Sequence, residues 1–303
     1  MASRFSTLLS VLLLNRMNRE MGMSKKRVLL ALVFMPLFAG VACAQTLPSE
    51  VKIATEGAYP PWNYTNADGS LAGYEIELTH VLCERMKVKC TVVGQEWNGI
   101  IPGLTVGKYD AIIASMGVTP ERKKVIAFSK SYAKAPNGFL TTSDNDLRNL
   151  ADSEHAFDLT GSPGEAQAAI DTLKLKFKGK VIGVQTGSTA SNFVREYFKG
   201  LDIRDYPTFE QLALDLANGR LDVGVANVTT FKPVIEANKG VLVSAGPTFA
   251  GGVLGQGTTN IALRQGDDAL RQAFDAAITS VNSDGTNRAL TEKWFGVDIS
   301  VRD

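Results

Sequence analysis

Strand and helix patterns alternate along the first third of the chain. Residues 51–55 alternate apolar and polar side chains, as a half-buried strand does. Apolar residues between positions 74 and 86 recur at helical spacing, and residues 90–93 again favour a strand. The apolar run 111–114 closes this series. The alternation predicts an α/β fold with mostly parallel sheets flanked by helices.

A second series of the same kind runs from residues 180–184 to the apolar run 223–226. Gly-Lys-Tyr-Asp at 107–110 precedes the first apolar run, and Gly-Arg-Leu-Asp at 219–222 precedes the second. In both, a glycine suited to ending a helix is followed by an aspartate that begins the strand. An ordinary helix-to-strand turn is one explanation of this similarity. Two related lobes are the other, and we expect two lobes.

The segment between the two series, residues 141–179, is rich in Ser, Asp, Gly and Pro, which predicts a surface insertion rather than a core element. A late strand at 260–263 and a helix marked by Leu270 and Phe274 are expected to return to the first lobe. The expected lobes are residues 45–137 with 246–303, and residues 138–245 with an insertion near 145–178.

The N-terminal residues 1–44 have the layout of a signal peptide. Lys25, Lys26 and Arg27 precede an apolar run too short to span a bilayer comfortably, which closes on Ala-Cys-Ala at 42–44. The mature chain is then expected to start near Gln45. The true translation start would be Met21 or Met23, because residues 1–22 fit poorly as an n-region. A retained anchor helix and lipidation of Cys43 are the alternatives.

Removal of residues 1–44 changes the charge balance of the chain. It takes away six of the 32 basic and one of the 31 acidic residues, which leaves 26 basic and 30 acidic side chains and a net charge near −4. This balance argues against nucleic acid or an anionic membrane as partner. The remaining length of about 259 residues favours two domains.

The few cysteines and histidines limit which disulfides, metal sites and catalytic bases the chain can form. Only Cys83 and Cys90 remain after cleavage, and an oxidising compartment favours a disulfide between them, tying the end of a helix to the next strand. His80 and His155 are the only histidines, and neither lies in a motif. We therefore expect no metal site, no cofactor and no imidazole base.

The segment 111–122 is the strongest candidate for a binding site. The apolar run that ends at Ala114 opens into a small turn that contains Ser115 and Gly117, and Arg122 follows. Backbone N–H groups exposed at such a turn, with a guanidinium above them, suit a carboxylate. A plain strand and loop with a surface arginine explain this segment equally well when it is taken alone.

Taken together, the motifs resemble those of periplasmic solute-binding proteins of the polar amino-acid class, which supply ABC importers. The resemblance covers essentially the whole mature chain and rests on the segments 73–78 (GYEIEL), 97–104 (WNGIIPGL), 109–113 (YDAII), 119–128 (TPERKKVIAF), 187–189 (GST), 219–222 (GRLD), 284–286 (DGT) and 294–296 (WFG). It implies the type II fold, in which two α/β lobes joined by two crossing strands close on a ligand. It also implies a monomer in the periplasm, with an inner-membrane ABC permease as partner.

The resemblance assigns roles to residues of this chain. The arginine matching Arg122 binds the ligand α-carboxylate through both of its terminal nitrogens. The rings matching Tyr59 and Trp97 sandwich the ligand side chain, although each ring would otherwise be read as core. Glu56 matches an acidic residue that meets a basic side chain; a solvated strand end is the alternative. The expected ligand-binding residues are Glu56, Tyr59, Trp97, Ala114, Ser115, Met116, Gly117, Arg122, Gln185, Gly187, Ser188, Thr189 and Asn227.

In the second lobe, Ser188 and Thr189 follow Gly187 and open a helix whose N-terminus favours anions. A plain N-cap role for Ser188 is compatible with this. Asn227 stands where binders of basic amino acids carry an aspartate for the α-ammonium. An amide there weakens selection for a free α-amino group and removes repulsion against an extra carboxylate.

The opines octopine and nopaline have that extra carboxylate and keep the guanidinium of arginine. Gln185, Ala114 and the insertion before residue 180 also resemble the octopine- and nopaline-binding branch. We therefore expect an opine ligand. A basic amino acid (arginine, lysine, ornithine or histidine) is the alternative.

Two other functions are compatible with parts of the sequence. A few periplasmic dehydratases resemble these binders, but Glu56 is the only candidate general acid and is better explained as the partner of a guanidinium. A ligand-sensing receptor domain is disfavoured because no apolar span precedes the last residue, Asp303. The glycine-rich segment 251–257 lacks the dinucleotide-binding spacing and is expected to be a flexible loop. We expect no catalytic residue.

Overall fold

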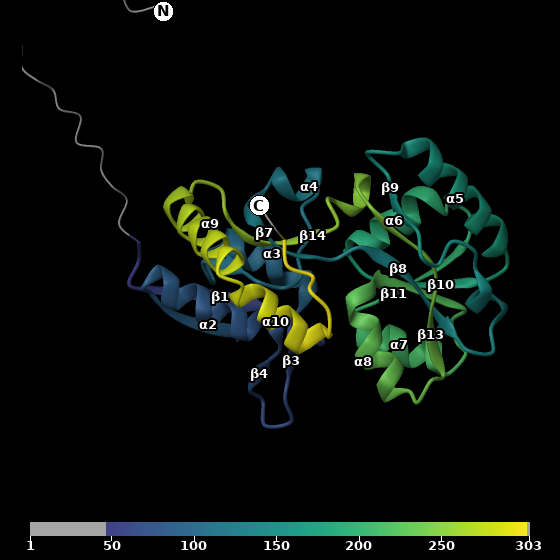
Figure 1. The fold of residues 1–303 in the computed structure, drawn as a ribbon, viewed down its shortest axis with the longest axis horizontal. Helices are drawn as coiled ribbons and strands as arrows, with labels where there is room; N and C mark the ends of the chain where they lie inside the picture. The colour runs from purple at the N-terminus through teal and green to yellow at the C-terminus, as the bar shows by residue number, and fades with distance from the viewer. Residues whose placement is uncertain (1–46, 302–303) are drawn as a thin grey trace, which may run out of the picture. The chain divides into compact units, whose positions relative to one another are not determined.

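The computed structural model describes residues 47–301 (Figure 1). The expected signal peptide, its alternative starts at Met21 and Met23, and Cys43 lie outside the described residues. Within residues 47–301, no helix combines the length and the apolar character that crossing a bilayer requires.

The strands and helices alternate as the sequence pattern predicts, with several short additional elements. The strands are β1 (Glu50–Thr55), β2 (Ala58–Tyr59), β3 (Asn63–Thr65), β4 (Leu71–Ala72), β5 (Lys89–Gly94), β6 (Ala111–Ile112), β7 (Ile126–Lys134), β8 (Asn137–Thr142), β9 (Ala156–Asp158), β10 (Val181–Gln185), β11 (Asp202–Tyr206), β12 (Val223–Asn227), β13 (Leu242–Ala250) and β14 (Thr258–Arg264). The α-helices are α2 (Tyr74–Met86), α3 (Trp97–Thr105), α4 (Pro120–Lys123), α5 (Pro163–Lys176), α6 (Thr189–Tyr197), α7 (Phe209–Ala217), α8 (Phe231–Ala237), α9 (Asp268–Ser283) and α10 (Thr286–Phe295). Short 3-10 helices are η2 (Asp146–Asn149), η3 (Val228–Thr230) and η4 (Gly252–Leu254).

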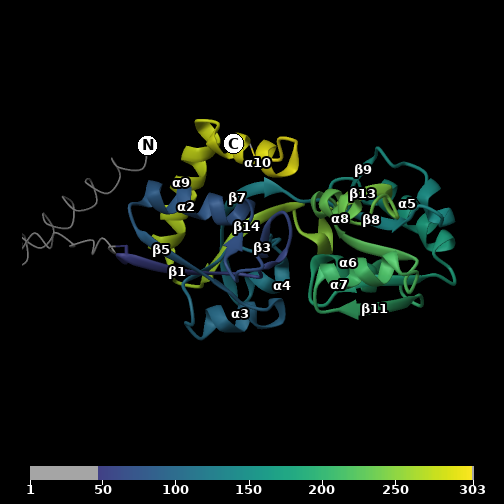
Figure 2. The same cartoon turned by 90° about the horizontal axis from the view of Figure 1, so that it is seen from below.

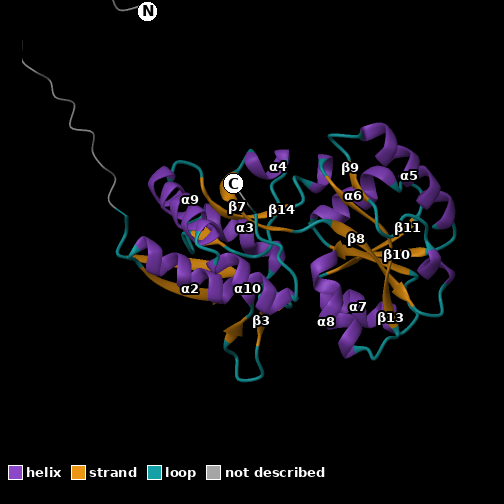
Figure 3. Cartoon of the chain, in the orientation of Figure 1, coloured by secondary structure: helices purple, strands orange, loops and turns teal. Residues whose placement is uncertain are grey.

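The first lobe is built on a five-stranded sheet of order β5-β1-β6-β14-β7. β1 runs parallel to β5 and β6, and β14 runs antiparallel to β6 and β7. Helices α2, α9 and α10 bury Leu78, Phe274 and Phe295 in one core, and α3 buries Ile100 and Leu104 in another. The late helices α9 and α10 therefore pack in the first lobe, beside α2 (Figure 3).

The second lobe is built on a six-stranded sheet of order β11-β10-β12-β8-β13-β9. β10 is parallel to β11 and β12, whereas β8 is antiparallel to β12 and β13. Helices α5 and α6 pack in one core and α7 and α8 in another, and Figure 3 shows these two pairs of helices on opposite sides of the sheet. The predicted α/β class, with parallel strands flanked by helices, is confirmed.

Two segments connect the lobes (Figures 1 and 2). The chain leaves β7 of the first sheet and enters β8 of the second through residues 135–136, and it returns from β13 to β14 through residues 251–257. The expected division at 245/246 falls inside β13, which stays paired in the second sheet up to Ala250. The return crossing therefore lies a few residues later than expected.

The glycine-rich return crossing is more ordered than the flexible loop expected from its composition. It contains η4, and the side chain of Leu254 is buried. Gly255 has φ +74°, and a Cβ atom there would lie 2.3 Å from the carbonyl oxygen of Val118. Glycine is required at this position by both the backbone conformation and the close approach.

The segment 141–179 was wrongly expected to contribute no core element. It forms η2, β9 and α5, and β9 pairs with β13. Leu147, Phe157 and Ile170 lie in the hydrophobic core of the second lobe. These apolar residues are sparse but spaced so that each element turns one of them inward, which the average composition of the segment conceals.

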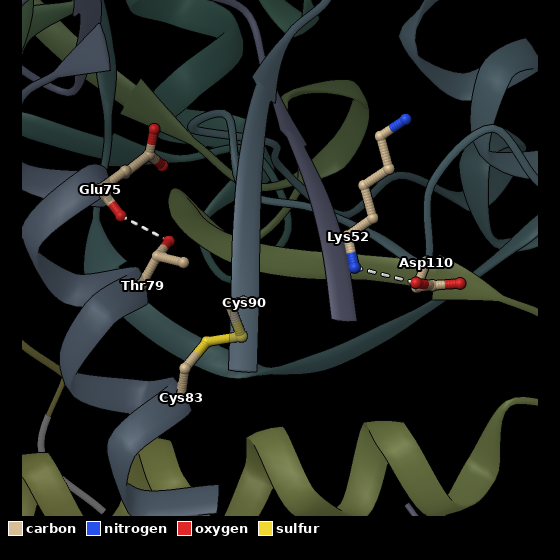
Figure 4. Close-up of a disulfide and its surroundings, with 6 residues drawn as sticks. All are labelled: Lys52, Glu75, Thr79, Cys83, Cys90 and Asp110. Atoms are coloured by element: carbon tan, nitrogen blue, oxygen red, sulfur yellow. Dashed lines mark hydrogen bonds between the residues drawn. A yellow bond between two sulfur atoms is a disulfide. The ribbon is translucent and has the colours of Figure 1, made fainter. Parts of the chain in front are cut away.

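Cys83 near the end of α2 and Cys90 in β5 form a disulfide, as predicted (Figure 4). It ties the helix to the strand that follows it. The described residues also contain no group of three or more His, Cys, Asp or Glu side chains that could hold a metal ion.

Candidate ligand-binding cleft

A pocket lies between the two lobes, where the carboxyl ends of β1 and β6 face those of β10 and β12. The predicted site residues that line it are Glu56, Tyr59, Trp97, Ala114, Ser115, Gly117, Arg122, Gln185, Ser188, Thr189 and Asn227. Residues more than 150 positions apart in the chain therefore meet at one pocket.

Two predicted residues do not line this pocket. The side chain of Met116 is fully buried in a core of the first lobe with Ile100 and Leu104, so it does not face the pocket. An apolar side chain at that turn gains more by packing into the core than by facing a polar cleft. Gly187 lines an adjoining cavity that shares Trp97 and Arg122 with the pocket, and its carbonyl oxygen accepts a hydrogen bond from Arg122.

Arg122 is held at the cleft by a short helix. Thr119 caps α4 and accepts a hydrogen bond from the backbone N–H of Arg122 at 3.2 Å. The guanidinium donates to the carbonyl oxygens of Gly117 (2.7 Å) in its own lobe and Gly187 (3.1 Å) in the other. It lies 5.3 Å from the centre of the Trp97 ring. Burial lowers the pKa of Arg122 to about 10, so the side chain remains cationic at neutral pH.

The turn at Ser115 is held from behind by a buried carboxylate. Ser115 has φ +45°, a left-handed conformation unusual for serine. Its backbone N–H donates to Glu75 at 2.6 Å, so this N–H points away from the cleft. The sequence predicts the opposite, that the N–H groups of this turn face a ligand. The hydroxyl group of Ser115 is the part of the residue that faces the second lobe.

Glu56 lies just beyond the end of β1, at the pocket wall. It is partly buried and accepts a hydrogen bond from Nε2 of Gln185 across the cleft at 2.5 Å. Burial raises the pKa of Glu56 to about 7, the bond from Gln185 opposes this shift, and the negative charges of Glu75 and Glu210 reinforce it. A cation bound beside Glu56 would restore its ionised form.

Tyr59 and Trp97 both line the pocket and are both partly buried. Tyr59 packs edge-on against Phe209 of the second lobe, with 5.9 Å between ring centres. Trp97 opens α3. Both rings therefore combine a packing role with a surface open to the pocket.

In the second lobe, Ser188 caps α6 by accepting a hydrogen bond from the backbone N–H of Ser191 at 3.0 Å, and Thr189 is the first helical residue. Asn227 ends β12. Its Oδ1 accepts hydrogen bonds from the backbone N–H (3.1 Å) and the hydroxyl (2.9 Å) of Thr229. Its Nδ2 lies 3.4 Å from Oγ of Ser115 in the first lobe.

The sequence did not indicate two residues that support or line the pocket. Asn137 lines the pocket from the first crossing strand and pairs with Asn227 in the ladder between β8 and β12. Trp62, fully buried in the first lobe, donates its indole N–H to the hydroxyl of Thr229 in the second lobe at 2.8 Å. The convergence of strand ends at one edge of a sheet could have indicated Asn137. Nothing in the local sequence indicates the bond from Trp62.

The chain belongs to the bacterial extracellular solute-binding proteins, family 3, which it matches over residues 51–297. It is 39% identical over 299 residues to the octopine-binding periplasmic protein of Rhizobium meliloti, which covers 92% of this chain and 99% of that protein. It is 32% identical over 254 residues to the L-arginine-binding protein of Pseudomonas aeruginosa, with 82% and 89% of the two chains covered.

Solved structures agree with this assignment. A periplasmic His/Glu/Gln/Arg/opine family-binding protein from Silicibacter pomeroyi, in complex with lysine, superposes with a TM-score of 0.66 at 31% identity. The superposition covers 83% of this chain and all of that one. The two-lobed fold of periplasmic binding proteins is thus shared, and these relatives are solute-binding proteins.

Proposed function

We propose that this protein is a periplasmic receptor that captures an arginine-derived opine, such as octopine or nopaline, and delivers it to an inner-membrane ABC importer. The proposal includes export through the N-terminal signal peptide, a monomeric state and binding without turnover. The relative from Rhizobium meliloti is named for octopine binding and is similar over nearly its whole length.

The charges of the cleft suit such a ligand. Arg122 offers a guanidinium to a ligand carboxylate, a charge-assisted interaction that contributes about 1.5–3 kcal/mol. Glu56 offers a carboxylate to the ligand's guanidinium. Tyr59 and Trp97 supply flat surfaces for the aliphatic stem between these two charged groups.

The orientation of the Asn227 amide is the observation that carries the choice of an opine. A backbone N–H can only donate, so the oxygen of the amide must face Thr229. The NH₂ group is thereby directed toward Ser115 and the pocket. A free α-ammonium, which also only donates, finds no acceptor in this amide, whereas a second carboxylate on the α-nitrogen finds a donor.

Calorimetric titration of the purified mature protein with octopine, nopaline, arginine, lysine and histidine tests the proposal. We expect an opine to bind most tightly, and at a hundredfold excess over its Kd to stabilise the fold by about 2.7 kcal/mol in thermal unfolding. Tighter binding of arginine than of either opine would replace the proposal with the basic amino-acid alternative.

A periplasmic dehydratase remains a second candidate because a cleft carboxyl with a pKa near 7 is what a general acid requires. Chromatography of each ligand after prolonged incubation with the protein separates the two functions. Recovery of unchanged ligand is expected, and any accumulating product would favour the enzyme.

A further inference from the structure

Glu75 is a fully buried acid that does not line the pocket, although it lies in the first turn of α2 close behind it. It belongs to the segment GYEIEL at 73–78, and it contacts the pocket residue Ser115. A buried carboxylate is costly unless hydrogen bonds satisfy it, so its partners show what it stabilises.

Three donors from three separate segments converge on the Glu75 carboxylate. Oε1 accepts from the backbone N–H of Ser115 at 2.6 Å and from the hydroxyl of Tyr132. Oε2 accepts from Nδ2 of Asn63 at 2.6 Å. Burial raises the pKa of Glu75 to about 7, and the three hydrogen bonds act in the opposite direction.

Asn63 extends this network to a second turn of the site. Its Oδ1 accepts a hydrogen bond from the backbone N–H of Gly57 at 2.6 Å. Gly57 directly follows Glu56 and has φ +74°, so it forms the turn between Glu56 and β2, which contains Tyr59. One carboxylate is therefore connected to the turn at Ser115 directly and to the turn between Glu56 and Tyr59 through Asn63.

We infer that Glu75 is a positioning residue of the ligand site, which holds the two pocket-forming turns of the first lobe in fixed relation through Ser115 and Asn63. The inference rests on the proposed binding function but not on which ligand binds. Glu75 does not line the pocket itself and acts through the residues that it holds.

The polarity of the network allows a strict test. In Glu75→Gln, the new Nε2 takes the place of Oε2 and faces Nδ2 of Asn63, so two donors meet. Rotating the Asn63 amide by 180° does not remove the clash between donors. Its Nδ2 would then face another donor, the N–H of Gly57. The additional change Asn63→Asp removes the clash: one carboxylate oxygen accepts from Gln at position 75 and the other from Gly57. The total charge of the network is then the same as in the wild type.

The experiment measures the Kd of wild type, Glu75→Gln, Asn63→Asp and the double variant by calorimetry, using whichever of octopine, nopaline and arginine binds the wild type most tightly. Glu75→Gln should weaken binding at least about tenfold, and the double variant should return to within about threefold of wild type. Glu77→Gln is the matched control. Glu77 lies two residues further along α2, where it pairs with Lys293 and Trp294 outside the site, so its Kd should stay unchanged.

Wild-type affinity in Glu75→Gln would overturn the inference. So would a double variant that folds, as judged by circular dichroism and cooperative melting, but binds no better than Glu75→Gln. If Glu75→Gln does not fold, the double variant alone decides: binding supports the inference and folded protein without binding overturns it. Preference of the wild type for arginine would refute the opine proposal while leaving this comparison intact.

Discussion

The two lobes build their halves of the cleft on the same local scheme. In the first lobe, the backbone N–H of Asp110 donates to the carbonyl of Lys52 in β1, and its carboxylate accepts from the N–H of Lys52 at 2.9 Å (Figure 4). In the second lobe, Asp222 makes the same two bonds with Val181 in β10, the second at 2.8 Å. The repeated Gly-x-x-Asp motif thus marks a repeated structure, and not merely a common turn.

The strand registers then identify equivalent residues at the cleft. Ile53 pairs with Ala111 in the first lobe as Ile182 pairs with Val223 in the second. Counting along the strands from these pairs, Glu56 corresponds to Gln185, and Ser115 corresponds to Asn227.

Each of these residues bonds to its own counterpart in the other lobe: Gln185 donates to Glu56, and Asn227 donates to Ser115. Contacts between equivalent positions are what an approximate two-fold relation between the lobes produces.

The difference between the lobes lies in charge. Among the described residues that line the pocket, Glu56 and Arg122 carry formal charge, and both belong to the first lobe. The second lobe presents the uncharged Gln185, Ser188, Thr189 and Asn227. We propose that the first lobe supplies charge pairing with the ligand, and with it most of the affinity, whereas the second lobe supplies oriented hydrogen bonds that discriminate between ligands.

Loss of Arg122 should give the largest effect. Arg122→Ala removes the partner of the ligand carboxylate, and we expect Kd to rise at least about a hundredfold, or roughly 2.8 kcal/mol. Arg122→Lys keeps the charge but loses the two-pronged geometry, so it should fall between Ala and wild type. Calorimetry together with thermal melting separates binding from folding. A Kd for Arg122→Ala within about threefold of wild type would reject the assignment.

The sequence predicted those parts of the site that depend on short motifs. Arg122 follows a turn recognisable within twelve residues, and Asn227 directly ends an apolar strand, so both could be placed in the cleft. The burial of the Met116 side chain could not be foreseen, because the sequence of a tight turn does not show which of its side chains enters the core.

Long-range contacts explain what sequence reasoning missed. The positioning role of Glu75 was not predicted, because it depends on contacts with Asn63, Ser115 and Tyr132, which are distant in the sequence. The core contribution of segment 141–179 was likewise hidden, because residues such as Ile170 find their partners in other strands and helices.

Moving the negative charge of Glu56 to the second lobe tests the difference in charge between the lobes. Glu56→Gln should weaken binding of a guanidinium ligand at least about tenfold, roughly 1.4 kcal/mol, because a charged partner is lost. Since Gln185 occupies the equivalent position and contacts Glu56, the double variant Glu56→Gln with Gln185→Glu should recover part of that loss. Calorimetry of the three proteins tests this. No recovery would mean that the two positions are not interchangeable.

The raised pKa of Glu56 should make ligand binding by the wild type depend on pH. With a pKa of about 7, Glu56 is mostly protonated at pH 6 and mostly ionised at pH 8. A guanidinium favours the ionised form, so affinity should rise as pH increases from about 6 to 8, with proton release on binding near pH 7. Titrations in two buffers of different ionisation enthalpy measure the released proton. Glu56→Gln should lose this proton release, and its persistence would point to another group.

Asn227→Asp tests the discriminating role of the second lobe. If the ligand carries a carboxylate on its α-nitrogen, the new aspartate repels it, and opine affinity should fall at least about tenfold. Arginine affinity should hold or improve, because the aspartate pairs with the α-ammonium. The two affinities must move in opposite directions. A parallel fall would mean that the substitution has damaged the cleft instead.

The smallest effect is expected at the two aspartates that define the shared scheme, and it concerns stability rather than binding. Asp110→Asn and Asp222→Asn each weaken one hydrogen bond from a backbone N–H, to Lys52 and Val181 respectively, and remove an ion pair with Arg264 or Lys180. These groups are partly exposed, so each change should lower the free energy of unfolding by only about 1 kcal/mol. Because the two hydrogen bonds to the backbone are the same in both lobes, the two losses should agree to within about 0.5 kcal/mol in urea denaturation. They should add in the double variant because the sites are separate. Ligand affinity should not change in either variant. A loss confined to one lobe would show that the matching hydrogen bonds do not carry matching energies, and that the likeness of the lobes ends at geometry.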